Sequence, residues 1–180
     1  FLPAISIEPD VFVQSTVNRA SSLLSKNISI DKKINELKKI ASETVDIKGI
    51  GFYTLGSVRK SLSNEDKEKY SSLFENYFLK SFASRLAEYT NPEIDVVDKE
   101  VLNEKYTIVN SLLKATNERP EIKINWRIYT KNPNNPLIRD LIIEGLSLAR
   151  TQKEEFSSIL STNDGDINAL FKTLEKFSNN

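Results

Sequence analysis

The spacing of apolar residues changes twice along the chain, and this change constrains the fold more than any other feature. Up to residue 89, apolar side chains recur every three or four residues, as they do on one face of an α-helix. Between residues 93 and 143 the period is mainly two, which is typical of strands, and after residue 151 the helical spacing returns. The order helices, sheet, helices predicts an α+β domain in which helices cover one face of a curved antiparallel sheet.

Four helices are expected before the sheet, and each starts at a recognisable signal. Their first turns lie near Pro9, Ser29, Asp46 and Ser63. The third should span 47–60, although Gly56 within it indicates that another backbone or a ligand comes close. The fourth should span 64–89 and carries a stripe of aromatic side chains.

About four antiparallel strands follow, joined by short turns. We expect them at 93–98, at 105–113, at 121–130 and in the apolar run after residue 137. The last strand has apolar residues on both faces, which favours a place in the middle of the domain, and Gly145 permits a bulge or a close backbone approach. A helix at 151–160 and a last helix after residue 166 complete the chain.

The composition limits the possible functions. The 180 residues, 39% of them hydrophobic, suffice for a single domain over 1–180. Lys plus Arg equals Asp plus Glu at 25 each, so the chain lacks the basic excess that nucleic-acid binding needs. No apolar run approaches the roughly 18 residues of a membrane-spanning helix, so we expect a soluble protein.

Three residue types are absent: His, Cys and Met. Without His and Cys, most metal sites and most nucleophilic triads are unavailable, so we expect neither an enzyme nor a bound cofactor or metal. The start Phe1-Leu2-Pro3-Ala4 is expected to follow a removed signal peptide, with residues 1–8 flexible. The lack of Cys fits the oxidising compartment that such a signal implies.

Several segments resemble one known family. The most specific runs from Asp140 to Leu148 and is similar to the family signature of Asp, an apolar run and Glu-Gly-Val-Ser-Leu. Further matches are segment 45–89 with Leu55-Gly56, Ser63 and 70–74, then Arg119-Pro120, Trp126-Arg127, Phe156 and 164–174. Over nearly the whole chain, the sequence resembles the MlaC family, the periplasmic phospholipid carriers also called toluene-tolerance auxiliary proteins. It departs where the family has Trp and Tyr, at Pro136 or Leu137 and at Arg139.

The resemblance implies a monomeric periplasmic lipid carrier with acyl chains in an apolar pocket between sheet and helices. It also implies exchange of phospholipid with an inner-membrane MCE-domain ABC transporter complex and an outer-membrane lipoprotein–porin complex, which maintains outer-membrane lipid asymmetry. The energetics require such a carrier, because hydrating one chain of roughly sixteen carbons costs on the order of 12 kcal/mol.

The candidate lining residues are the apolar side chains of the aromatic stripe, of the sheet and of the third helix. They are Leu55, Val58, Phe74, Phe78, Phe82, Leu86, Ile108, Leu112, Ile124, Trp126, Ile128, Ile143 and Leu146. Any single member can equally be ordinary core. On this interpretation, Ile128→Glu should abolish lipid retention while the protein still folds.

Other interpretations stay open. The cargo can be a hopanoid or another polycyclic lipid. A small α+β enzyme would need Asp95 or Asp140 beside Tyr106 or Tyr129. A third possibility is an interaction module with a filled core. Separate from these, Glu144 is interpreted as accepting hydrogen bonds from loop amides. Candidate contacts to a phosphate are Arg85, Arg127 and Arg139.

Overall fold

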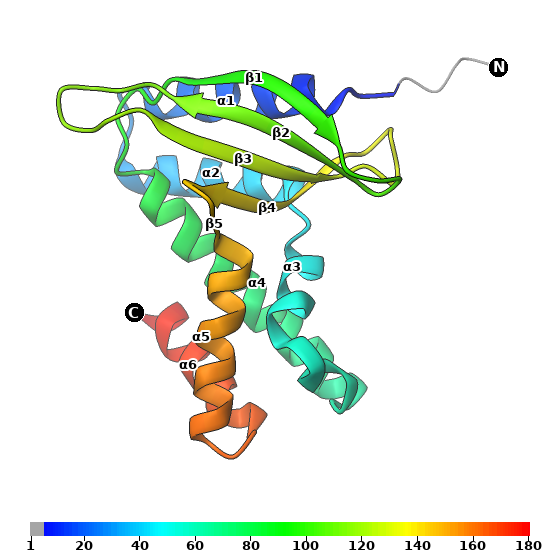
Figure 1. The fold of residues 1–180 in the computed structure, drawn as a ribbon. Coiled ribbons are helices and arrows are strands. Elements are labelled where there is room, and N and C mark those ends of the chain that lie inside the picture. The colour runs from blue at the N-terminus through cyan, green and yellow to red at the C-terminus, as the bar shows by residue number, and fades with distance from the viewer. Residues whose placement is uncertain (1–5) are drawn as a thin grey trace.

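A computed structural model describes residues 6–180 and confirms the α+β fold class (Figure 1). The N-terminal helices are α1 (Pro9–Leu24), α2 (Ile30–Thr44), α3 (Ile47–Leu55), the 3₁₀ helix η1 (Gly56–Lys60) and α4 (Asn64–Leu86). The strands are β1 (Ile94–Val101), β2 (Tyr106–Leu113), β3 (Ile122–Tyr129), β4 (Leu137–Ile143) and β5 (Leu146–Ser147). The chain ends with α5 (Leu148–Thr162) and α6 (Ile167–Asn179).

The flexible N-terminus predicted over 1–8 falls in part on residues 1–5, which lie outside the described residues. Nearer the first helix, the Ile7 N–H donates to the carbonyl of Pro133 at 3.0 Å. Glu8 forms an ion pair with Lys99 on β1. These two contacts hold the entry to α1 against the sheet.

The helix starts follow the predicted signals. Ser29, Asp46 and Ser63 each accept a hydrogen bond from a backbone N–H in the first turn of the following helix, which satisfies one of the donors that a helix end leaves unpaired. The ends differ from expectation. The helix predicted over 47–60 stops at Leu55 because Gly56 takes a φ of 59°, and η1 completes the segment. A Cβ at Gly56 would meet the side chain of Lys153 rather than another backbone.

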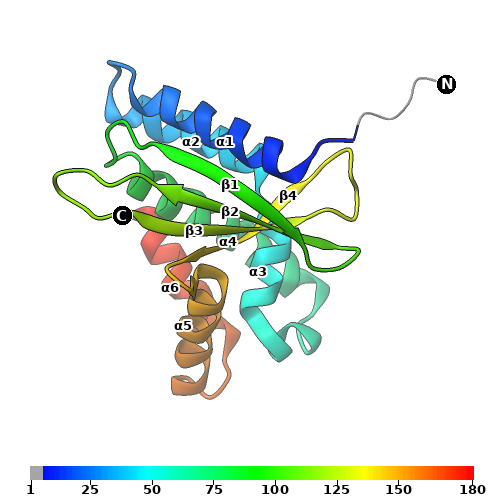
Figure 2. The same cartoon turned by 45° about the horizontal axis from the view of Figure 1, so that its top comes forward.

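The sheet is antiparallel throughout, in the order β1-β2-β3-β4-β5. Helices α1 and α2 cover one face, and α3 to α6 form a second layer beyond the β4 side (Figures 1 and 2). The strand after residue 137, expected in the middle of the domain, is β4, which lies between β3 and the two-residue β5 and contacts helices α3 and α5. Gly145 (φ 82°) and Glu144 (φ 48°) form the tight turn between β4 and β5, where the sequence suggested a bulge or a close backbone approach.

The inner face of the sheet contains the residues that alternate as buried along β2 and β3. On β3 these are Ile124, Trp126 and Ile128. On β2 the buried positions are Thr107, Val109, Ser111 and Leu113, so Ile108 and Leu112 lie on the outer face, contrary to the prediction that they line the pocket. Two hydrogen bonds explain this, because Ser111 Oγ donates to the Ile124 carbonyl at 2.7 Å and accepts from Trp126 Nε1 at 2.8 Å.

The second helical layer is packed around an aromatic cluster. The ring of Phe74 lies 5.8 Å from Tyr70 and meets Phe156 of α5 edge-on at 6.3 Å. Tyr70 is fully buried, its hydroxyl lies 2.7 Å from Thr54 Oγ1, and burial raises the pKa of this phenol. The layer is therefore a filled core that supports the sheet from its β4 side.

Gly51 is required where α3 crosses α4. A Cβ at this position would lie 2.7 Å from Cδ1 of the buried Phe74 ring. We expect Gly51→Ala to lower the free energy of unfolding by about 1–3 kcal/mol, because overpacking outweighs the helix propensity that alanine adds. Urea denaturation measures the effect, and adding Phe74→Leu should recover part of the loss. Gly51→Ala with wild-type stability would contradict the close approach.

Candidate functional site

The apolar core of residues 6–180 is divided into two clusters. The smaller one lies where α1, α2 and α4 meet and consists of Leu23, Leu24, Leu37, Ile40 and Ala83. The larger one joins the inner face of the sheet to residues of all six helices, including Val13 and Val17 of α1 and Ala41 of α2. A cavity of about 180 Å³ lies between side chains of the two clusters. The hollow therefore exists because the helices and the sheet do not close completely on each other.

Three walls enclose this cavity, and nearly all their side chains are aliphatic or aromatic. Helices α1 and α2 contribute Thr16, Val17, Ala20, Ser21, Leu24, Leu37, Ile40, Ala41 and Thr44, with Val45 after them. Helix α4 and the segment after it contribute Phe82, Leu86, Tyr89 and Pro92. The sheet contributes Ile94, Leu113, Ile122, Ile124, Trp126, Ile138, Leu141 and Ile143.

The three serine and threonine hydroxyl groups in the walls are already paired. Thr16, Ser21 and Thr44 each donate to a backbone carbonyl, at 2.8, 2.7 and 2.7 Å. The indole N–H of Trp126 donates to Ser111. With these donors satisfied and no charged side chain in the lining, the cavity offers little to a water molecule and suits an apolar ligand.

Burial of the lining residues changes from one end of the cavity to the other. Val45, Trp126 and Ile138 are buried. Tyr89 is 39% exposed, and Ile122 is half-buried. The cavity therefore opens to solvent at the end of the sheet where α4 leads into β1.

The structure brings five of the thirteen predicted lining residues to this cavity. They are Phe82, Leu86, Ile124, Trp126 and Ile143. They come from α4, β3 and β4, so the aromatic stripe of α4 and the inner face of β3 meet across one hollow.

The other eight predicted residues lie elsewhere among the described residues. Leu55, Phe74 and Ile128 are buried in packed core, and Phe78 stacks between Phe74 and Phe82. Val58 is half-buried in η1. Ile108 and Leu112 lie on the outer face of the sheet because Ser111 and Thr107 occupy the inner one, and Leu146 is 58% exposed in the β4–β5 turn region.

Sequence reasoning missed the wall formed by α1 and α2. The stripes of these helices were recognised as apolar, with Val17, Leu24, Leu37, Ile40 and Ala41 among their members. A stripe that lines a hollow has the same spacing as one that fills a core. Small residues such as Ala20 and Ala41 within these stripes are a local signal that space remains beside them.

The polar residues considered in the sequence have structural partners. Arg139 Nε lies 2.6 Å from Asp46 Oδ2, and its Nη1 donates to Tyr106 Oη at 3.0 Å. The Asp140 carboxylate accepts from Ser147 Oγ and from the Ala149 N–H, at the start of α5. No hydrogen bond joins Asp95 or Asp140 to Tyr106 or Tyr129 in the part of the chain that the structure describes, so the Asp/Tyr arrangement of the enzyme hypothesis is not assembled.

Two further sequence candidates have structural contacts. Glu144 accepts a hydrogen bond from the Lys123 N–H at 2.6 Å, on the neighbouring strand. Arg127 lies on the outer face with its guanidinium 4.2 Å from the ring centre of Tyr106. Both groups are therefore remote from the inner face, and neither contributes to the cavity lining.

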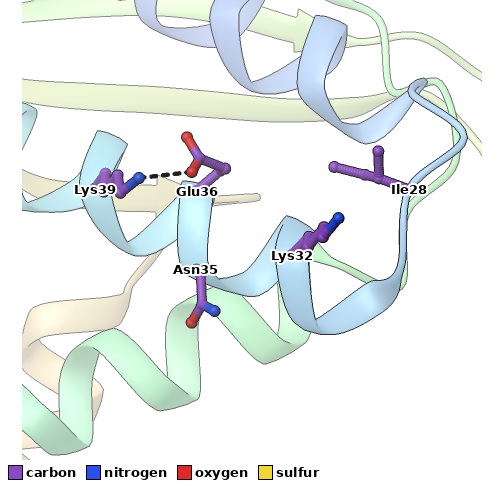
Figure 3. Close-up of a pocket in the computed structure, with 5 residues that line it drawn as sticks. All are labelled: Ile28, Lys32, Asn35, Glu36 and Lys39. Atoms are coloured by element: carbon purple, nitrogen blue, oxygen red, sulfur yellow. Dashed lines mark hydrogen bonds and ion pairs between the residues drawn. The ribbon is translucent and has the colours of Figure 1, made fainter.

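A second, larger depression of about 600 Å³ lies over α2 and has a different character (Figure 3). Its residues are Ile28, Lys32, Asn35, Glu36 and Lys39, and Lys39 pairs with Glu36 at 2.7 Å. This surface is polar and open, so it cannot exclude water from an apolar ligand. Within residues 6–180, no helix is long and apolar enough to span a bilayer, and no group of three or more His, Cys, Asp or Glu could hold a metal.

The fold and the cavity together define an α+β domain whose sheet and helices enclose a dry apolar hollow. The family model described as MlaC protein matches residues 14–176, and the chain therefore belongs to the MlaC family. Among solved structures, the chain is similar to the phospholipid-binding protein from Ralstonia solanacearum, determined in complex with a phospholipid. The two are 17% identical with a TM-score of 0.79, over 96% of this chain and 97% of the other. This likeness shows a shared fold.

Proposed function

We propose that this protein is a phospholipid carrier that holds acyl chains in the cavity between the sheet and helices α1, α2 and α4. The observation that carries the proposal is the apolar lining, in which the hydroxyls of Thr16, Ser21 and Thr44 are all bonded to backbone carbonyls. Membership of the MlaC family and the phospholipid bound by the Ralstonia solanacearum relative support it.

The finer part of the proposal concerns where the lipid goes. The carrier works in the periplasm and exchanges phospholipid with an inner-membrane MCE-domain ABC transporter complex and an outer-membrane lipoprotein–porin complex. Its biological role is to maintain outer-membrane lipid asymmetry. The support is family membership, together with the energetics: with on the order of 12 kcal/mol needed to hydrate one tail, lipid crosses an aqueous gap only when an apolar cavity replaces the bilayer.

The size of the cavity implies that its walls move when lipid binds. About 180 Å³ is below the roughly 300–1,000 Å³ of pockets that enclose drug-sized ligands, and an acyl chain is at least as large. The walls must therefore separate when lipid enters. Helices α1 and α2 form the wall opposite the inner face of the sheet, so we expect them to move away from it, which breaks the contacts of Val13, Val17 and Ala41 within the larger cluster.

Organic extraction of the purified protein, followed by lipid mass spectrometry, tests the proposal. We expect phospholipid in amounts stoichiometric with the protein, and transfer of labelled phospholipid between two vesicle populations when the protein is added. A polycyclic lipid as the only extract would assign the cavity a different cargo. Protein that neither retains nor takes up any lipid would contradict the carrier function.

A further inference from the structure

Arg119 lies at the open end of the cavity. It belongs to the hairpin between β2 and β3, and Leu113 and Ile122 at the base of that hairpin both line the cavity. Its guanidinium carbon is 5.4 Å from the ring centre of Tyr89, the most exposed of the aromatic lining residues. Figure 1 shows the β2–β3 hairpin, the end of α4 and the start of β1 together at this end of the sheet.

The charge of Arg119 is not compensated by any side chain that the structure describes. Its Nε is buried and has no hydrogen-bond partner, and no carboxylate among residues 6–180 forms an ion pair with it. Lys114, at the start of the same hairpin, is different. It pairs with Glu93 at 2.8 Å and with Asp95 at 3.5 Å. Of the two cations on this hairpin, only Arg119 lacks a carboxylate partner among the described residues.

A buried N–H without an acceptor is costly, and a guanidinium matches the geometry of two phosphate oxygens. Stacking on Tyr89 limits the conformations of the Arg119 side chain, which reduces the entropy lost when an anion binds. A lipid whose tails fill the cavity must leave its polar head at the open end, next to this side chain.

We propose that Arg119 binds the phosphodiester of the lipid whose tails occupy the cavity, and that it thereby selects phospholipids over uncharged diacyl lipids. The inference rests on the proposed carrier function. The contact is to the phosphate, which all glycerophospholipids share, so selectivity among head groups is not expected from this residue.

The test uses vesicles that contain phosphatidylglycerol, phosphatidylethanolamine and diacylglycerol with identical acyl chains. Protein is incubated with the vesicles and re-isolated, and bound lipids are quantified by mass spectrometry. We expect Arg119→Gln to lower the ratio of bound phospholipid to bound diacylglycerol by about threefold to tenfold, equally for both phospholipids. Arg119→Lys should recover part of the ratio. Lys114→Gln is the matched control and should leave the ratio unchanged, because that charge is already paired.

Each outcome is decisive. An unchanged ratio in a folded Arg119→Gln variant, or a change confined to phosphatidylglycerol, overturns the phosphate contact while leaving the carrier function intact. Inorganic phosphate at millimolar concentration should not alter the ratio for wild-type protein. If phosphate lowers the ratio in wild-type protein as much as Arg119→Gln does, the residue binds free phosphate and the proposal fails. Wild-type protein that takes up none of the three lipids contradicts the carrier function itself.

Discussion

Replacing Ala41 with Phe is expected to abolish phospholipid retention. Ala41 is 1% exposed on α2 and lines the cavity, so a benzyl group there occupies the space that an acyl chain needs. Filling a pre-existing hollow costs less than overpacking a tight core, for which about 1–3 kcal/mol is usual, and a stability of about 5–15 kcal/mol tolerates it. Bound phospholipid per protein, measured after purification, should fall to the background level while thermal unfolding stays cooperative.

Two further variants make this result interpretable. Ser42→Phe adds the same ring to the neighbouring exposed position of α2 and should leave lipid retention unchanged. Ala20→Phe blocks the same cavity from α1 at a half-buried position and is the alternative if Ala41→Phe fails to fold. Folded Ala41→Phe and Ala20→Phe proteins that retain the wild-type amount of phospholipid would show that the lipid lies elsewhere.

The second large effect is the loss of folding expected for Ile128→Glu. From the sequence alone, this substitution should remove lipid and leave the fold intact. In the structure, Ile128 is fully buried on the inner face of β3, paired with Ile138 of β4, and does not line the cavity. Removing the buried side chain costs about 2–5 kcal/mol, and burying an unpaired carboxylate adds several more, which together match the whole stability of a typical domain.

Circular dichroism and solubility after expression measure this outcome. The controls are Leu146→Glu, at a site 58% exposed, and Leu112→Glu, on the outer face of the sheet. Both should fold and retain phospholipid, although the sequence placed Leu112 and Leu146 in the lining. A folded Ile128→Glu protein that has lost only its lipid would restore the sequence-based placement and contradict the packing described above.

The fold could be predicted because its signals are local. Caps at Ser29, Asp46 and Ser63 and the alternation along β3 each depend on a few neighbouring residues. Element ends were less predictable, since Gly56 ends a helix through a positive φ that apolar spacing does not reveal. The two-residue β5 was not expected, because a strand this short has no period.

The candidate site was only partly predictable, for a different physical reason. Alternation on β2 separates two faces but does not say which is inward, because Val109 and Leu113 on one face are about as apolar as Ile108 and Leu112 on the other. The hydrogen bonds of Ser111 belong to the inward face. Likewise, an apolar stripe on a helix does not indicate whether the opposite surface packs against it or leaves a cavity. The hollow between α1, α2 and β3 is a property of how the layers are spaced, so only the assembled structure locates it.

The central claim is that acyl chains lie in the cavity between the sheet and the helices, and the single tryptophan of the chain tests it directly. Trp126 lines that cavity and is 7% exposed. Phospholipids with brominated acyl chains quench indole fluorescence on contact, so exchanging bound lipid for the brominated form should strongly reduce Trp126 emission relative to the unbrominated lipid. Undiminished emission from protein that demonstrably carries brominated phospholipid would contradict the account.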